Sequence, residues 1–198
     1  MAVNSNIQSF LNTVQQGVKN NLFRVDFIFP QAMSSEKPVD ETVSMLCKAA
    51  ALPASNLGVI EVPFRGRTVK IAGDRTFDTW TATVINDRNQ TIRHGFEKWM
   101  EGINSHLGNT ATTWQPDTAG TGYVTNLTVT QLERDDQPAG SALRTYTLVG
   151  CFPTNISQID LAYDSNDQIE DFTVEFQLQY WTATKGDAPG VGGFDIKA

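Results

Sequence analysis

Two histidines and a short acidic segment are the side chains whose types and spacing come nearest to a chemical site. His94 and His106 lie twelve positions apart on one predicted helix, which places them about 120° apart around its axis. They cannot bind one metal ion from a single face, and neither has a second ligand four residues away. We therefore interpret both as histidines of the surface or of the core edge.

The acidic segment resembles the first half of a calcium-binding loop. Asp164, Asn166 and Gln168 have the alternate spacing of such a loop, and Glu175 falls at its twelfth position. Ile169, however, stands where the loop needs glycine for its sharp turn, so we predict an ordinary acidic turn. The chain also lacks the phosphate-binding, nucleophilic-serine and zinc-protease motifs. We expect no enzyme activity, no cofactor and no metal.

Composition indicates one globular domain. The chain has 198 residues, 40% hydrophobic and 19% charged, with no break in composition. A net charge of −7 and a pI of about 4.7 oppose binding to nucleic acid by the chain as a whole. The sequence shows no secretory signal and no run near the ~20 apolar residues of a membrane span. Cys47 and Cys151 are expected to be buried thiols in a reducing compartment, although the sequence leaves a disulfide open.

The clearest strand pattern runs from Phe172 to Thr182, where apolar and polar residues alternate. Successive side chains of a strand point to opposite faces, so we expect one long strand. Its core-facing residues would be Phe172, Val174, Phe176, Leu178 and Tyr180. Its wet face would carry Glu175, Gln177 and Gln179.

Other elements follow from the same reasoning. Apolar spacing predicts a helix over residues 91–106, capped by Asp87 or Asn89, and a short N-terminal helix over residues 7–18. Arg65-Gly66 predicts the turn of a hairpin. The hairpin strands are expected at 59–64 and 67–72, and further strands at 22–29, 77–85, 123–132 and 143–152, the last ended by Pro153. Turns and loops are expected at 31–41, Gly73-Asp74, 109–122, 133–140 and 156–170, and residues 42–52 fit either a strand or a helix.

About seven or eight strands in hairpin order, with no alternation of strand and helix, predict a mainly β fold. The expected architecture is an antiparallel β-sandwich or partly closed barrel with one flanking α-helix and a short N-terminal helix. We treat residues 1–198 as one domain, with an N-terminal helical arm (1–20) and a flexible C-terminal tail (185–198). Phe194 and Ile196 in that tail are available to dock on a partner.

Opposite charges gather in two segments. Residues 65–75 carry four cations against one carboxylate, and residues 160–175 carry six carboxylates and no cation. The cations are Arg65, Arg67, Lys70 and Arg75. In a monomer such segments are ordinary solvated faces, but in a protein that stacks on its own copies they would meet across a head-to-tail contact and set its register.

Several unusual stretches occur in the order found in tail tube proteins of contractile-tailed bacteriophages, which the chain resembles. They are LCKAAALP at 46–53, IEVPFRGR at 60–67, residues 69–76 with Gly73-Asp-Arg, Trp80, the helix 92–104 with Phe96 and Trp99, and the closing Tyr180-Trp181. The likeness covers most of the chain, is densest over residues 46–104, and carries no active site.

The resemblance implies a structural subunit of the tail tube. Six copies of such a protein close into a ring, and rings stack head to tail into a tube whose lumen is a continuous barrel. Viral DNA passes through it, so contact with DNA is transient and non-specific. Implied partners are the contractile sheath, which the tube templates, the baseplate and the tail terminator, without membrane insertion. Implied localisation is the virion tail, after assembly in the host cytoplasm. Type VI secretion tube proteins are similar in fold.

Two hypotheses place residues within such a tube. Glu175, Gln177 and Gln179 would face the lumen, and the hairpin of residues 59–72 would contact the neighbouring ring through its cations. The helix 91–106 would either cover the core only or lie partly at a subunit boundary.

Three other classes stay open at this point. A tube protein of a secretion or other contractile injection system would share the fold but move protein. A soluble ligand-binding β-sandwich would use an aromatic platform, for which Trp114 and Tyr123 give thin support. An enzyme would need a cluster of titratable groups that the sequence does not show.

Overall fold

In the computed structural model, antiparallel strands are the main regular structure of the chain, which confirms the mainly β fold with few helices. The structure describes residues 7–15, 17–36, 38, 40–111, 114–116, 122–133, 141–164, 166–186 and 195–197. The helices are α1 (Ile7–Gln15), the 3-10 helix η1 (Gln31–Glu36), α2 (Asp40–Met45) and α3 (Thr91–Ile103). The strands are β1 (Phe23–Asp26), β2 (Cys47–Ala50), β3 (Asn56–Phe64), β4 (Arg67–Thr76), β5 (Trp80–Ile85), β6 (Thr125–Leu132), β7 (Ala142–Ile156), β8 (Asp171–Gln177) and β9 (Tyr180–Lys185).

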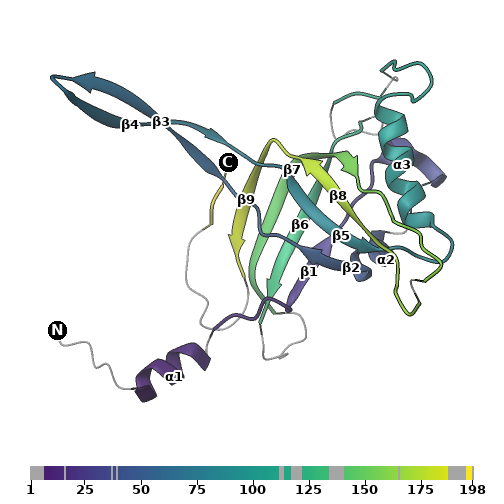
Figure 1. Cartoon of the computed structure of the whole chain (residues 1–198), viewed down its shortest axis with the longest axis horizontal. Coiled ribbons are helices and arrows are strands. Elements are labelled where there is room, and N and C mark those ends of the chain that lie inside the picture. The colour runs from purple at the N-terminus through teal and green to yellow at the C-terminus, as the bar shows by residue number, and fades with distance from the viewer. Residues whose placement is uncertain are drawn as a thin grey trace.

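The strands form an open sandwich whose two layers share β7 (Figure 1). The first layer contains β1, β6, the first half of β7, and β9, while the second contains the end of β7, β8, β5 and β2. β3 and β4 pair only with each other and form a separate hairpin. Every pairing is antiparallel.

Strand β7 passes from one layer to the other at Gly150, which has a positive φ of 71°. A side chain is strained in that conformation, and a Cβ here would also lie 2.6 Å from Cγ of Gln179. The predicted end of this strand at Pro153 is wrong, because β7 continues to Ile156. From Phe152 onward the strand pairs only with β8, and proline is tolerated in such an edge position because its missing N–H is not needed there.

The predicted single strand from Phe172 to Thr182 is also wrong. It is divided into β8 and β9, which pair with different partners in the two layers. Across the break at Leu178 and Gln179 the alternation changes phase, since Leu178 is buried, Tyr180 exposed and Ala183 buried. The chain passes from one layer to the other within β7 and again between β8 and β9. The alternation of apolar and polar residues does not show where these passages occur.

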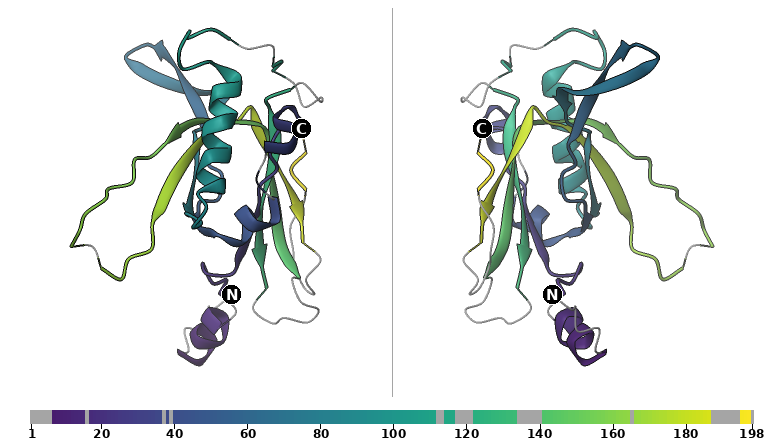
Figure 2. Two further views of the ribbon diagram at one scale, coloured as in Figure 1. Left: turned by 90° about the vertical axis from the view of Figure 1, so that its right-hand side faces the viewer. Right: turned by 90° about the vertical axis from the view of Figure 1, so that its left-hand side faces the viewer.

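The core lies between the layers, and α3 packs at their open side (Figure 2). Ile92, Phe96 and Trp99 of α3 are buried, as their spacing predicts. α3 ends at Ile103, so the predicted extension to residue 106 is wrong, and Leu107 is fully exposed. Large rings from both layers converge on the helix, among them Phe27, Phe29, Phe172 and Phe176.

The region between β1 and β5 differs most from expectation. Residues 31–41, predicted as a loop, contain η1 and the start of α2, and residues 42–52 contain both the end of α2 and β2. Gly73-Asp74, predicted as a turn, lies within β4, where Gly73 packs against the backbone of Gly58. Helices and strands of only four to six residues are too short for the spacing of their apolar residues to reveal a helical or strand periodicity in the sequence.

Gln90 occupies the N-cap position of α3 and makes no capping hydrogen bond through its side chain. Asp87, one of the two predicted candidates, serves the first turn from three residues further back. Its carboxylate accepts hydrogen bonds from the Thr91 hydroxyl and from the backbone N–H of Ile92 at 3.1 Å. Burial on its own raises the pKa of Asp87, but the hydrogen bonds together lower it below its ordinary value.

Replacing this cap by Asp87→Ala should therefore lower the free energy of unfolding by about 1 kcal/mol at pH 7. Because folding lowers this pKa, the stabilisation is complete above the ordinary carboxyl pKa of about 4 and is lost as pH falls through the folded-state value. Urea unfolding at pH 7 and at pH 2.5 measures the difference. Asn89→Ala, the other candidate, should change stability by less than about 0.5 kcal/mol, and a deficit for Asp87→Ala that does not shrink in acid would contradict this assignment.

Candidate assembly interface

The β3–β4 hairpin extends from the body as a long arm (Figure 1). Apart from Gly73, every residue of both strands is exposed. At its base Asn56 donates a hydrogen bond to Asp78 at 2.7 Å, and Arg75 donates one to Ser55 at 3.4 Å. The predicted hairpin is thus confirmed, and both of its faces are accessible to another molecule.

The two faces of this arm differ in polarity. Residues directly opposite each other on antiparallel strands share a face, and the register pairs Ile60 with Ile71 and Val62 with Val69. The apolar face therefore carries Ile60, Val62, Phe64, Val69 and Ile71, each between 42% and 61% exposed, with Arg67 opposite Phe64 at its tip end. The opposite, polar face carries an ion pair between Glu61 and Lys70 at 3.7 Å. A contiguous apolar face in full contact with solvent is typical of a protein–protein contact surface.

The structure separates the four cations of the hairpin. Arg65 lies in the turn at the tip and Arg67 directly follows the turn. The guanidinium of Arg65 lies 5.4 Å from the ring centre of Phe64. Lys70 pairs with Glu61, and Arg75 lies at the base beside Ser55. Within the described part of the chain no carboxylate pairs with Arg65 or Arg67. The tip therefore has two cations available to an acidic partner.

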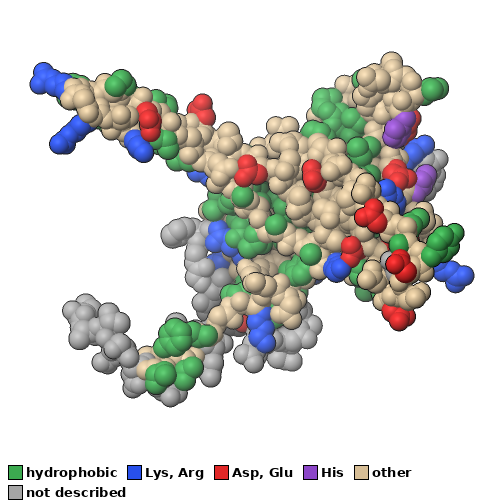
Figure 3. Space-filling view, in the orientation of Figure 1, with side chains coloured by type: hydrophobic (Ala, Val, Ile, Leu, Met, Phe, Trp, Pro, Cys, Tyr) green, Lys and Arg blue, Asp and Glu red, His purple; other side chains and the backbone are tan. Residues whose placement is uncertain are grey.

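Helix α1 is a second arm. Its apolar residues Ile7, Phe10, Leu11 and Val14 are all exposed, with Phe10 at 65%. Figure 3 shows these side chains together on a helix that stands away from the body. The predicted N-terminal helix is confirmed over residues 7–15, and its apolar stripe has no cover among the described residues.

The margins of the sandwich are open. Among the described strands, β1 pairs only with β6, β2 only with β5, and β9 only with β7. Side chains of α2 bind part of the margin next to β1, because Ser44 and Asp40 accept hydrogen bonds from the backbone N–H groups of Phe27 and Phe29. Ile196 adds a single bridge to Ala183 on β9, whereas Phe194 lies outside the described residues. Open margins are where another copy can add a strand.

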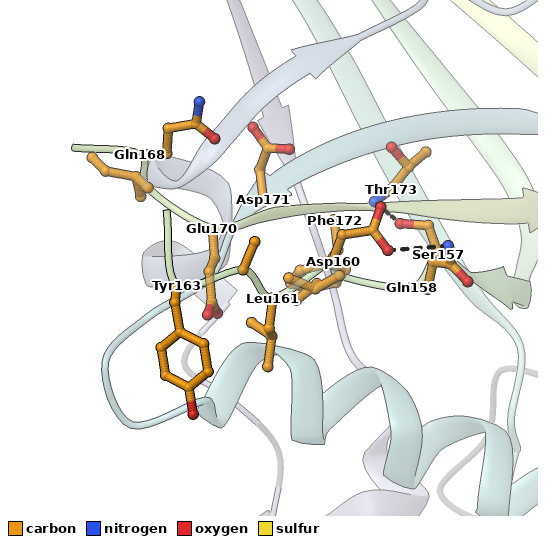
Figure 4. A pocket seen from close by; sticks show the side chains of 13 residues that line it. Ser157, Gln158, Asp160, Leu161, Tyr163, Gln168, Glu170, Asp171, Phe172 and Thr173 are labelled. Carbon is orange, nitrogen blue, oxygen red and sulfur yellow. Dashed lines mark hydrogen bonds between the residues drawn. The ribbon is translucent and has the colours of Figure 1, made fainter. Parts of the chain in front are cut away.

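The acidic segment forms an exposed loop between β7 and β8, on the side of the body away from the hairpin (Figures 1 and 3). Figure 4 shows a hollow beneath it, with Gln158 donating a hydrogen bond to Asp160 at 3.2 Å and the backbone of Thr173 donating to Ser157 at 2.9 Å. Among the residues that the structure describes, no three His, Cys, Asp or Glu side chains are grouped so that they could hold a metal ion. The loop thus offers exposed carboxylates to a partner.

Glu175, Gln177 and Gln179, expected on one wet face, fall in two places. Glu175 and Gln177 are half-buried on the outer face of β8, with the buried Val174 and Phe176 on the inner face. Gln179 lies in the break between β8 and β9, where its backbone N–H donates to the carbonyl of Val149. The structure therefore keeps Glu175 and Gln177 together and separates Gln179 from them.

The remaining chemical candidates lie apart from one another. Cys47 and Cys151 are free thiols, and burial raises the pKa of Cys47 to about 11 and that of Cys151 to about 12, so both stay protonated and unreactive near neutral pH. His94 is exposed on α3. His106 lies beyond the end of α3 and contacts Glu101. No helix in the described part of the chain is long and apolar enough to cross a membrane.

The fold is that of subunits found in contractile injection systems. A chain from the cryo-EM structure of the anti-feeding prophage tube-terminating cap aligns at a TM-score of 0.60 and 14% identity, over 93% of this chain and 99% of that one. A chain from the extended sheath–tube complex of the extracellular contractile injection system PVC aligns at 0.58 and 14% identity, over 92% and 99%. At this identity the likeness defines the class of fold.

Sequence comparison then gives the family. The model of the phage tail tube protein family matches residues 18–184. Tail tube protein gp19 of Enterobacteria phage T4 is 35% identical over 161 residues, which are 81% of this chain and 88% of that protein. The chain belongs to the phage tail tube protein family, which confirms the resemblance seen in its sequence.

Sequence reasoning did not single out the apolar face of the hairpin, whereas the apolar stripe of α1 was evident from its helical spacing. The turn at Arg65-Gly66 fixes the pairing of the strands, so Ile60, Val62 and Phe64 could have been placed on one face from sequence. Whether the body covers that face depends on where the hairpin leaves the sandwich, which no local pattern records.

Proposed function

We propose that six copies of this chain form a ring and that rings stack head to tail into the hollow tail tube of a phage with a contractile tail. The single observation that carries this is that the subunit is open: among the described residues, three margins of the sheets have no further strand paired to them and two apolar arms have no cover. The chain belongs to the phage tail tube protein family, and open strand margins and exposed apolar arms are surfaces that a stacking subunit would bury.

In this proposal viral DNA moves through the tube without being held. A net charge of −7 repels a phosphate backbone, and the lumen would be lined by Glu175, Gln177 and Gln179. The subunit acts as a wall and catalyses no reaction. In this proposal residues 1–198 form one domain, with an N-terminal arm at residues 1–20 and a C-terminal tail at residues 185–198.

The proposed partners follow from related assemblies. Solved structures with this fold include a sheath–tube complex, a baseplate and a tube-terminating cap, so we propose a sheath, a baseplate and a terminator as partners of this tube. One of these structures is 6-fold symmetrised, which supports six subunits in a ring. Assembly would occur in the host cytoplasm and the product would reside in the virion tail.

The PVC sheath–tube complex comes from an extracellular contractile injection system, and it favours a second candidate, a tube that delivers protein. The two candidates share the subunit and its stacking. DNA in the purified particles, or the genes beside this one, separates them.

Negative-stain electron microscopy and analytical ultracentrifugation of the purified protein test the proposal. Rings or tubes support it. A monomer of 21.8 kDa at every concentration overturns it.

The tip of the hairpin is proposed to contact the next ring. Arg65 and Arg67 have no described carboxylate partner, and the exposed acidic loop of residues 157–170 lies on the other side of the body (Figure 3). Stacking in one direction brings opposite ends of two copies together. Lys70 contributes less because Glu61 already pairs with it, and Arg75 contributes at the base of the arm.

Charge reversal at Arg65→Glu and Arg67→Glu should reduce tube formation at least about tenfold, since two attractive contacts become repulsive, while the thermal unfolding midpoint stays unchanged. Adding Asp160→Arg and Asp164→Arg should restore tubes. Arg88→Glu with Lys98→Glu changes the net charge equally and should leave tube length as in the wild type. Tubes of normal length from the reversed hairpin would reject this contact.

A further inference from the structure

We propose that helix α1 of one copy lies on the apolar face of the β3–β4 hairpin of another copy. This rests on the proposed function and names two surfaces that meet in the polymer. Both are apolar, both are solvent-exposed in the single subunit, and both belong to segments that extend from the body.

Both apolar surfaces need another surface to cover them. The stripe of α1 and the apolar face of the hairpin together expose nine large apolar side chains. They are Ile7, Phe10, Leu11 and Val14 on the helix, and Ile60, Val62, Phe64, Val69 and Ile71 on the hairpin. Exposed apolar clusters of this kind mark contact surfaces. Figure 1 shows the two arms leaving the body separately, and they do not meet within one chain, so the cover for each comes from elsewhere.

The two surfaces also match in shape and length. Ile7, Phe10, Leu11 and Val14 are spaced i, i+3, i+4 and i+7, which makes one stripe along the helix. The nine residues of α1 are about 13.5 Å long, and the hairpin from Ile60 to Phe64 extends about 13 Å. One helix therefore covers the apolar face from end to end.

Charge favours this occupant over a charged partner. α1, with the sequence IQSFLNTVQ, contains no Lys, Arg, Asp or Glu, so it brings no charge to the apolar face. The charge on that face is Arg67, which lies opposite Phe64 at the tip end and is exposed. The ion pair between Glu61 and Lys70 lies on the polar face and stays in water. The contact is heterologous, because each copy gives one arm and receives another, and such a contact propagates through a ring or a stack.

Disulfide trapping in assembled tubes tests the contact. In a Cys47→Ala background, Phe10→Cys or Leu11→Cys is combined with Val62→Cys or Val69→Cys, and the assembled protein is oxidised. A disulfide needs Cα atoms within about 7 Å, so at least one of the four pairs should give a ladder of covalent oligomers on denaturing gels. Expected yields are at least about tenfold above those of the controls.

Two controls keep the same arms but change the face. Ser9→Cys lies about 150° around the helix from the centre of the stripe, and Thr68→Cys lies on the polar face of the hairpin opposite Pro63. Leu11→Asp should also raise the concentration needed for tube formation by at least about tenfold, and Ser9→Asp should not.

The possible results distinguish failure of the contact between α1 and the hairpin from failure of the proposed tube function. Tubes in which all four pairs crosslink no better than the controls overturn the contact and leave the tube function standing. Crosslinks that form equally within the dilute monomer overturn the contact between copies. Failure of the unmodified chain to form any ring or tube overturns both proposals.

Discussion

Excision of the β3–β4 arm should abolish rings and tubes while the subunit remains folded. Asn56 and Thr76 are partners in the register of the hairpin, so Leu57–Arg75 can be replaced by Asn-Gly, which closes a two-residue turn. The removed segment contributes no residue to the buried core. It contains the whole apolar face and the cationic tip, and its loss removes both proposed contacts of the arm.

The stability of the excised subunit should equal that of the unassembled wild type or exceed it slightly, because a shorter connection costs less loop-closure entropy. Circular dichroism on heating measures the fold, and sedimentation velocity with negative-stain microscopy measures assembly. Glu61→Ala with Lys70→Ala is the matched control, since it keeps the arm and its apolar face, and it should still form tubes. Tubes from the excised chain would show that the arm has no part in assembly.

Patterns that depend on neighbours in sequence predicted the fold well. The stripe of α3, the hairpin turn and the alternation in β5 and β6 are local, and each element appears where its pattern places it. A register shift between Thr125 and Leu127 explains why β6 loses strict phase, as a bulge predicts.

Features set by distant parts of the chain were not predictable in this way. β7 continues through Pro153 because only one strand lies beside it there. This depends on how the layers are assembled and cannot be read from the proline itself. β8 and β9 look like one strand because both obey alternation, yet the chain crosses between layers at Leu178 and Gln179. Gly150, with its positive φ, marks the matching crossing in β7.

The candidate interface shows the same division. The cations of residues 65–75 and the carboxylates of residues 160–175 were evident from composition. The ion pair of Lys70 and the position of Arg65 and Arg67 at the tip are known only from the register of the hairpin and from the way the arm projects. Exposure of an apolar face is a property of the whole molecule, because the same alternation in β5 is buried.

The largest loss of subunit stability should come from Phe96→Ala. Phe96 is fully buried on α3, and its ring centre lies 5.0 Å from that of Phe29, 5.9 Å from Phe176 and 6.2 Å from Phe172. It therefore joins the helix to both layers of the sandwich at once. Truncating such a side chain removes its burial and leaves a cavity, which costs about 3–5 kcal/mol, a large share of the 5–15 kcal/mol that holds an average domain.

The measurement belongs in the arm-excised chain, because association with other copies raises apparent stability by mass action and would hide the loss. Urea unfolding of Phe96→Ala in that background should give the full deficit, whereas Phe96→Leu should lose less because it keeps most of the volume. Leu107→Ala removes a fully exposed side chain just past the end of α3 and should change stability by less than about 0.5 kcal/mol. A loss below 1 kcal/mol for Phe96→Ala would mean that α3 is not what holds the two layers together, and the helix would then be free to serve at a subunit boundary instead.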